Sequence, residues 1–177
     1  MAERLKAHDW NSCIRLNVSR VRIPSSPPSV ANKEHLMWMR SHSKVYQNIS
    51  AEQIWKLWTD INNWPSWNAD LEYCKLEQAF KVGSVFKFKP KGAPAVQISL
   101  VEIDYEKMFT DCTKFWGAKM YGKHEMRVEG SALKLSTTIT FTGILKRLWI
   151  KLVAQKVVDK FALQMDTLVQ LALVQKG

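Results

Sequence analysis

The stretch ILKRLWIKLVAQKVVDKFALQMDTLVQLALV at residues 144–174 contains neither glycine nor proline and directly follows Gly143. Its apolar residues recur every three or four positions, as they do on one side of a helix. The resulting stripe is too broad for a helix on the protein surface. We therefore expect one long C-terminal helix lying in a groove made by the rest of the chain. The stripe consists of Leu145, Leu148, Ile150, Leu152, Ala154, Val157, Val158, Phe161, Ala162, Met165, Leu168, Val169 and Leu171.

The region before this helix is typical of an antiparallel sheet. Turn residues separate short segments in which apolar and polar residues alternate. In one of these segments Met120, His124 and Met126 share a face, and Lys123 and Arg127 share the other. The sequence therefore predicts an α+β fold in which seven antiparallel strands wrap around the C-terminal helix. The expected strands are 36–49, 71–77, 85–89, 95–104, 108–116, 119–129 and 133–141.

Two short helices are expected after the first strand. Ser50 is a suitable N-cap, and Gln53 three residues later completes a capping box for a helix over 51–58. Pro65 and the preceding asparagines indicate a tight turn or a second short helix over 60–67. In the first strand, Val45 and Ile49 are the candidate core residues.

The N-terminal 35 residues differ from the remainder. They hold six Lys and Arg against three acidic residues, and they include the Pro/Ser stretch RIPSSPPSVAN. We interpret residues 1–35 as a poorly ordered basic tail or linker, or as an over-extended start ahead of Met37 and Met39. An organelle-targeting peptide is the less favoured alternative. The folded domain is expected to span 36–174.

Composition narrows the function classes. The 177 residues are 46% hydrophobic and include eight Trp, which is ample for one folded core. The net charge of +10 comes from Lys and Arg scattered along the chain, so no nucleic-acid partner is expected, although weak contact with an anionic membrane surface is open. No apolar run approaches the roughly 18–20 residues that span a bilayer. The sequence gives no oligomeric state.

The cysteines and histidines do not form a metal-binding pattern. Cys13, Cys74 and Cys112 are widely spaced without a C-x-x-C pair, and the four His, at 8, 35, 42 and 124, do not cluster. We therefore expect no metal and no cofactor. Free thiols fit a cytoplasmic location, with Cys74 and Cys112 as buried structural residues.

Two blocks of sequence resemble the START-like (SRPBCC) superfamily, which contains the birch pollen allergen, and in particular its polyketide cyclase/dehydrase and lipid-transport branch. The blocks are ISAEQIWKLWTDINNWPSWNADL at 49–71 and YGKHEMRVEGSALKLSTTITFTGILKRL at 121–148. The resemblance implies a helix-grip fold that encloses a cavity for lipids, sterols, plant metabolites or polyketides. The matching residues are Ser50, Ile54, Trp55, Thr59, Asp60, Trp64, Pro65, Trp67, Asn68, Gly122, His124, Met126, Leu135, Phe141 and Gly143.

His124 and Asp111 are the candidate catalytic residues. His124 is expected to point toward the helix, where an imidazole can orient a ligand carbonyl or transfer a proton near neutral pH. Asp111 lies on the same side of its strand as Phe109 and Phe115 if that strand is regular, and it could then pair with His124. The alternative, slightly favoured, is that a β-bulge turns Asp111 to solvent and Thr110 and Cys112 inward.

Eleven apolar residues are the candidate cavity lining. The same residues describe an ordinary core equally well, and only an observed void distinguishes the two readings. They are Phe86, Phe88, Ile98, Leu100, Met120, Met126, Leu135, Ile139, Phe161, Met165 and Leu168.

Three functions are compatible with these observations. The favoured one is binding or transport of a small hydrophobic ligand in the cavity, without turnover. The second is a polyketide cyclase or dehydratase that uses the His124–Asp111 pair. The third is a membrane-associated lipid-handling module, in which Lys146, Arg147 and Lys151 contact the surface and Trp149 lies among the lipid headgroups.

Overall fold

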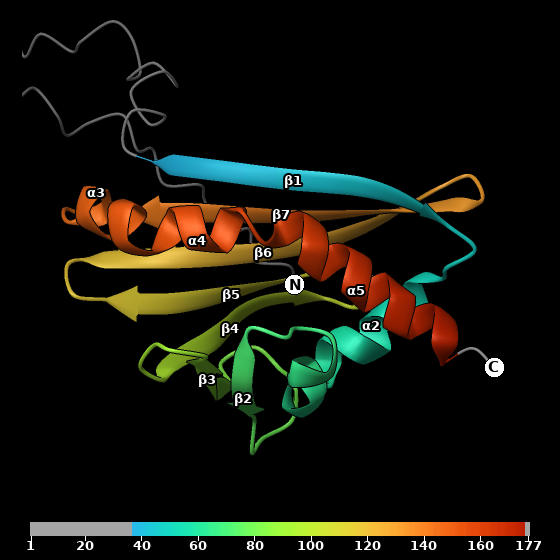
Figure 1. The fold of residues 1–177 in the computed structure, drawn as a ribbon, viewed down its shortest axis with the longest axis horizontal. Helices are drawn as coiled ribbons and strands as arrows, with labels where there is room; N and C mark the ends of the chain where they lie inside the picture. The colour runs from blue at the N-terminus through green and yellow to red at the C-terminus, as the bar shows by residue number, and fades with distance from the viewer. Residues whose placement is uncertain (1–36, 176–177) are drawn as a thin grey trace, which may run out of the picture.

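The computed structural model describes residues 37–175, and the predicted tail at 1–35 lies outside them. Seven antiparallel strands form one sheet in the order β1-β7-β6-β5-β4-β3-β2, as predicted. Two short helices follow β1, and the C-terminal helices cover one face of the sheet (Figure 1). The elements are β1 Trp38–Gln47, α2 Ala51–Thr59, the 3-10 helix η1 Ile61–Ser66, β2 Leu71–Lys75, β3 Val85–Pro90, β4 Val96–Asp104, β5 Met108–Phe115, β6 Ala118–Glu129, β7 Ala132–Thr142, α3 Lys146–Trp149, the π-helix η2 Ile150–Ala154, α4 Gln155–Val158 and α5 Phe161–Val174.

The capping box at the start of α2 is present as predicted. The Ser50 hydroxyl accepts a hydrogen bond from the Gln53 backbone N–H, and the Gln53 side chain accepts one from the Ser50 N–H. The Gln53 amide also donates to the carbonyl of Ala172 at 3.3 Å. The cap thereby ties α2 to the last turn of α5.

The C-terminal helix is not continuous, which differs from the prediction. A π-helical segment, η2, follows α3, and the helix breaks at Asp159 and Lys160 before α5 begins. No glycine or proline lies there, so the tertiary contacts of the two halves account for the break. The first half lies along β1 and β7, whereas α5 crosses toward α2 (Figure 1). The side chain of Lys160 forms an ion pair with Asp70 at this point.

The face of the sheet that the helices cover, called here the inner face, carries two separate apolar clusters. One cluster lies toward α2 and includes Trp58, Leu100 and Phe109, and the other lies toward α3 and includes Phe141 and Ala154. Burial of the apolar side chains in these two clusters is the main term that stabilises the fold.

The predicted core of the first strand is half right. Ile49 is buried, but Val45 is 47% exposed. The pairing of β1 with β7 explains the difference. Val45 pairs with Lys134 on the outer face of the sheet, while Tyr46 pairs with Leu133 on the inner face.

Helix α5 is fastened to β1 by one carboxylate. Asp166 accepts hydrogen bonds from Lys44 Nζ and from the Tyr46 hydroxyl, both at 2.7 Å. These two hydrogen bonds, the one from Lys44 first, hold the pKa of Asp166 below its usual range. Burial, together with the neighbouring carboxylate, raises the pKa of Tyr46.

We expect Asp166→Asn to lower the free energy of unfolding by about 1 kcal/mol at neutral pH, since the pair with Lys44 is half exposed and screened. A carboxyl whose pKa is lower in the folded than in the unfolded chain contributes fully above about pH 4, and the contribution is lost as the pH falls through the lowered value. Urea unfolding of the variant and the parent across this range measures the difference. Asp159→Asn is the control, because among residues 37–175 the Asp159 carboxylate accepts only from Gln155, four positions earlier. A loss that is equal at about pH 3 and about pH 7 would contradict this account.

Candidate functional site

Four polar side chains form a row across the middle of the inner face, called here the polar row: His42 of β1, Thr137 of β7, His124 of β6 and Asp111 of β5. Thr137 is paired directly with both His42 and His124. Asp111 is paired with Gly122, which is two residues before His124 on the same strand face. Side chains alternate regularly between the two faces on four neighbouring strands, and this alternation brings the four residues together. His42 and Thr137 are 95 positions apart in the sequence.

The carboxylate and the imidazole lie close together. His124 Nε2 is 3.5 Å from Asp111 Oδ2, and His124 Nδ1 is 3.4 Å from the Thr137 hydroxyl oxygen. The imidazole stacks on Phe109 at 4.6 Å between ring centroids, and Trp58 meets its edge. The His124 side chain is 25% exposed and the Asp111 side chain 10% exposed. Both groups therefore face the helices while remaining accessible from outside the core.

Gly122 makes room for the carboxylate. A Cβ at this position would lie 3.0 Å from both carboxylate oxygens of Asp111. Any larger residue would push the carboxylate away from His124. The Gly122-x-His124 spacing, which is part of the sequence resemblance, therefore has a steric reason in this chain.

The favoured orientation of Asp111 was wrong. Asp111 is only 7% exposed, and its carboxylate lies beside His124. The β-bulge expected in β5 is absent, and the shift in strand register lies in the neighbouring strand β4, between Leu100 and Glu102. Thr110 and Cys112 occupy the opposite face of β5, where the Thr110 hydroxyl donates to Glu102 Oε2 at 3.1 Å.

Two buried polar atoms on the inner face have no hydrogen-bond partner among the described residues: Nε2 of His42, a member of the polar row, and Oγ1 of Thr113. Thr113 follows Asp111 by two residues on the same strand face. Buried polar atoms are almost always paired, because leaving one unpaired costs about 1–3 kcal/mol. In this structure both atoms therefore carry a cost of burial that no hydrogen bond offsets. Sequence reasoning missed both residues, although the alternation of β1 places His42 on the same face as Trp38 and Tyr46.

The eleven predicted lining residues all belong to the two apolar clusters, one on each side of the polar row. Nine of these side chains are buried, and Phe88 and Met120 are half-buried. The first cluster takes Phe86, Phe88, Ile98, Leu100, Met126, Leu135, Met165 and Leu168, and the second takes Met120, Ile139 and Phe161.

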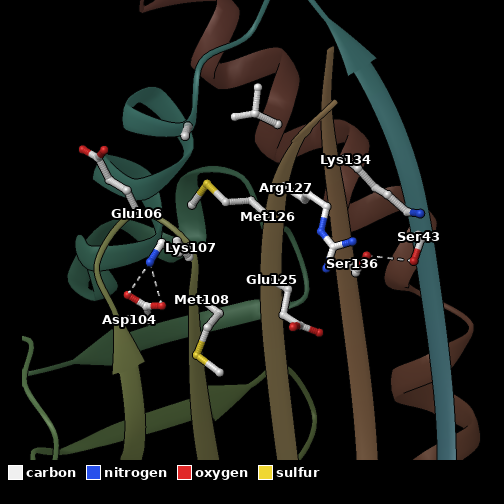
Figure 2. Close-up of a pocket in the computed structure, with 12 residues that line it drawn as sticks. Ser43, Asp104, Glu106, Lys107, Met108, Glu125, Met126, Arg127, Lys134 and Ser136 are labelled. Atoms are coloured by element: carbon white, nitrogen blue, oxygen red, sulfur yellow. Dashed lines mark hydrogen bonds and ion pairs between the residues drawn. The ribbon is translucent and has the colours of Figure 1, made fainter. Parts of the chain in front are cut away.

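Two hollows in the described part of the chain lie elsewhere. The larger, of about 620 Å³, is an open groove with a charged rim between the β4–β5 turn and the end of the β6–β7 hairpin (Figure 2). Met126 is the one predicted lining residue that it contains. The other, of about 410 Å³, lies at the β5–β6 turn. The predicted lining side chains therefore pack as core in this structure, and the expected cavity between sheet and helix is neither of these hollows.

Metal and membrane features are also absent from the described residues. No group of three His, Cys, Asp or Glu side chains within 37–175 is placed to hold a metal ion. None of the helices in that range combines the length and hydropathy needed to cross a bilayer.

Burial raises the pKa of the Cys74 thiol to about 12 and raises that of Cys112 as well. Neither cysteine is therefore an activated nucleophile.

We expect Thr113→Val to raise the free energy of unfolding by about 1 kcal/mol, because the change replaces an unpaired buried hydroxyl with a methyl group of similar size. Thr110→Val on the same strand is the matched control and should lower it by a similar amount, since it removes the hydrogen bond to Glu102. Thermal and urea unfolding of both variants measure the difference. If Thr113→Val is as destabilising as Thr110→Val, the Thr113 hydroxyl has a partner in solution and is not available to a ligand.

Comparisons with known proteins agree with this architecture. No protein-family model and no curated protein matches the chain. Norcoclaurine synthase from Thalictrum flavum, solved with dopamine and hydroxybenzaldehyde, is similar at 12% identity over 89% of this chain and 99% of that one, with a TM-score of 0.64. Ara h 8.0201 is similar at 14% identity over 78% and 99%, with a TM-score of 0.63. A START superfamily protein from Mycobacterium smegmatis is similar at 14% identity over 75% and 98%, with a TM-score of 0.59. The chain therefore has the START-like helix-grip fold that its sequence resembles.

Proposed function

We propose that the chain binds a small, mostly apolar molecule between the inner face of the sheet and the C-terminal helices, and that the polar row binds the polar groups of that molecule. One observation carries the proposal: a carboxylate–imidazole pair lies in the middle of the inner face, and the buried atoms His42 Nε2 and Thr113 Oγ1 on the same face have no hydrogen-bond partner within residues 37–175. Nothing in the packing of the core requires ionisable groups there, and a few convergent polar groups on an apolar face are typical of small-molecule sites.

The chemistry of the polar row indicates the kind of ligand. Asp111 accepts a hydrogen bond from a hydroxyl or an amine, while the imidazole of His124 can donate to a carbonyl or accept from a hydroxyl. The Thr113 hydroxyl can do either. A lipid or polyketide with an oxygen-bearing end and an apolar body fits this arrangement. The apolar body would gain about 25 cal/mol for each Å² that it removes from water.

Binding requires the two apolar clusters to separate slightly around the ligand. Met120, Met126 and Met165 belong to these clusters, and methionine adapts its shape more easily than branched residues do. The helix break at Asp159 and Lys160 gives the cover of the inner face a point at which to bend. The free thiols Cys74 and Cys112 fit a reducing compartment such as the cytoplasm.

A ligand of this kind should be found by native mass spectrometry of gently purified protein, and adding it back to stripped protein should raise the Tm. At a concentration 100 times its Kd the stabilisation is about 2.7 kcal/mol. His124→Phe should keep the fold but weaken binding by about tenfold, because a hydrogen bond to the ligand is lost. Val128→Ser, which changes an exposed residue far from the polar row, is the control.

The absence of any co-purified molecule, together with no change in Tm across a panel of fatty acids, sterols and aromatic polyketides, would contradict the proposal. Equal affinity of His124→Phe and the parent for an identified ligand would keep ligand binding but remove the polar row from it.

A second candidate function is acid–base catalysis, favoured by the distance between His124 and Asp111. A carboxylate beside an imidazole orients the ring and stabilises its protonated form, which suits proton removal next to a carbonyl during ring closure or dehydration. Norcoclaurine synthase illustrates that this fold can carry an enzyme. If the chain turns over a polyketide, His124→Gln should lower kcat by at least about a hundredfold with a smaller effect on KM. Unchanged turnover in this variant would exclude the mechanism.

A further inference from the structure

Four apolar side chains project from the end of the molecule where β5, β7 and α3 meet. Trp116 is 81% exposed and Ile144 is 91% exposed, and Leu148 and Leu152 are about half exposed. Trp116 belongs to the β5–β6 turn, whereas the other three belong to the start of the C-terminal helical region. They form, with the cations described below, what is called here the end surface.

The end surface is held rigidly by close contact between two turns. The Leu145 backbone N–H donates to the Gly117 carbonyl at 3.0 Å, and a Cβ on Gly143 would lie only 2.5 Å from that carbonyl oxygen. Gly117 and Gly143 both have positive φ, at 66° and 103°. Only glycine fits this approach without strain. Trp116 and Ile144 are therefore presented on a preformed platform.

Trp149 does not have the role that the sequence predicted. Its ring stacks on Phe115 at 4.4 Å between centroids, and its Nε1 donates to the Trp116 carbonyl at 2.9 Å. It supports the platform from behind while Trp116 is the exposed aromatic residue. Only the structure could distinguish the two, because both residues are flanked by lysine or arginine within two or three positions in the sequence.

The charge of the end surface has a single sign. Its exposed cations are Lys114, Lys119, Arg147 and Lys151. No Asp or Glu occurs from residue 112 to 124 or from 130 to 158, the segments that supply the end surface. Exposed apolar residues ringed by cations are typical of a surface that binds anionic lipid headgroups while its apolar residues enter the acyl boundary.

We infer that the end surface docks the protein on an anionic lipid bilayer. A second copy of the chain is disfavoured as the partner, because a symmetric dimer would place these cations opposite each other. Nucleic acid would satisfy the cations but leaves the four exposed apolar side chains without a role. The inference does not depend on the proposed ligand, since the polar row lies in another part of the sheet.

Sedimentation of the full chain with phosphatidylcholine vesicles, with and without phosphatidylserine, tests the inference. We expect binding to the mixed vesicles that weakens as salt is added. Trp116→Ser combined with Ile144→Ser should reduce binding at least tenfold, because two large side chains no longer enter the membrane. Lys114→Gln and Lys119→Gln should each reduce binding about fivefold on phosphatidylserine vesicles only.

Val128→Ser and Lys81→Gln are the matched controls, since both residues are exposed and lie away from the end surface. His124→Phe should bind vesicles as the parent does, which separates this inference from the proposed function. Binding that is unchanged in the Trp116 and Ile144 double variant, or that does not respond to phosphatidylserine, would overturn the inference. So would a parent that dimerises through this surface without binding vesicles, as measured by light scattering of parent and double variant.

Discussion

The strand register across β1, β7, β6 and β5 is the constraint on which the rest of the structure depends. Side chains alternate between the two faces of a strand, so a slip of one residue in any of these pairings would exchange the inner and outer sets. The existing register places Leu133, Leu135 and Phe141 under the helices. The same register places His42, His124 and Thr137 there, because they lie on the same faces. The polar row is thus fixed by the pairing that builds the apolar core.

Holding polar groups in this position costs stability. The two apolar clusters would merge into one core if the polar row were apolar. Within the described part of the chain, His42 Nε2 and Thr113 Oγ1 also have no hydrogen-bond partner to offset their burial. Natural proteins keep such arrangements where function benefits from them. The stacking of Phe109 on His124 and the space left by Gly122 indicate that the pair is positioned by its surroundings. This is the physical basis for placing the binding site at the polar row and not in the larger groove on the rim.

Much of the fold could be predicted because its signals are local. The alternation of apolar and polar residues predicted the strand ends to within a few residues, and the Ser50 capping box predicted the start of α2. The errors concern choices made by distant contacts. Val45 was expected in the core, but it pairs with Lys134 on the outer face of the sheet. Asp111 was expected to face solvent, but Gly122 on the neighbouring strand leaves room for its carboxylate on the inner face. The break at Lys160 has no local breaker, since it follows from two halves of a helix packing on different partners.

The C-terminal helical region links the two proposed sites. Its first half packs against β1 and β7 on one side and carries Arg147, Leu148, Lys151 and Leu152 of the end surface on the other, while α5 is held to β1 by Asp166. A helix that continued straight through residue 160 would keep the direction of the first half and leave α2 without its partner. Because the break separates the halves, bending at Lys160 would uncover the inner face without moving the rigid turns at Gly117 and Gly143.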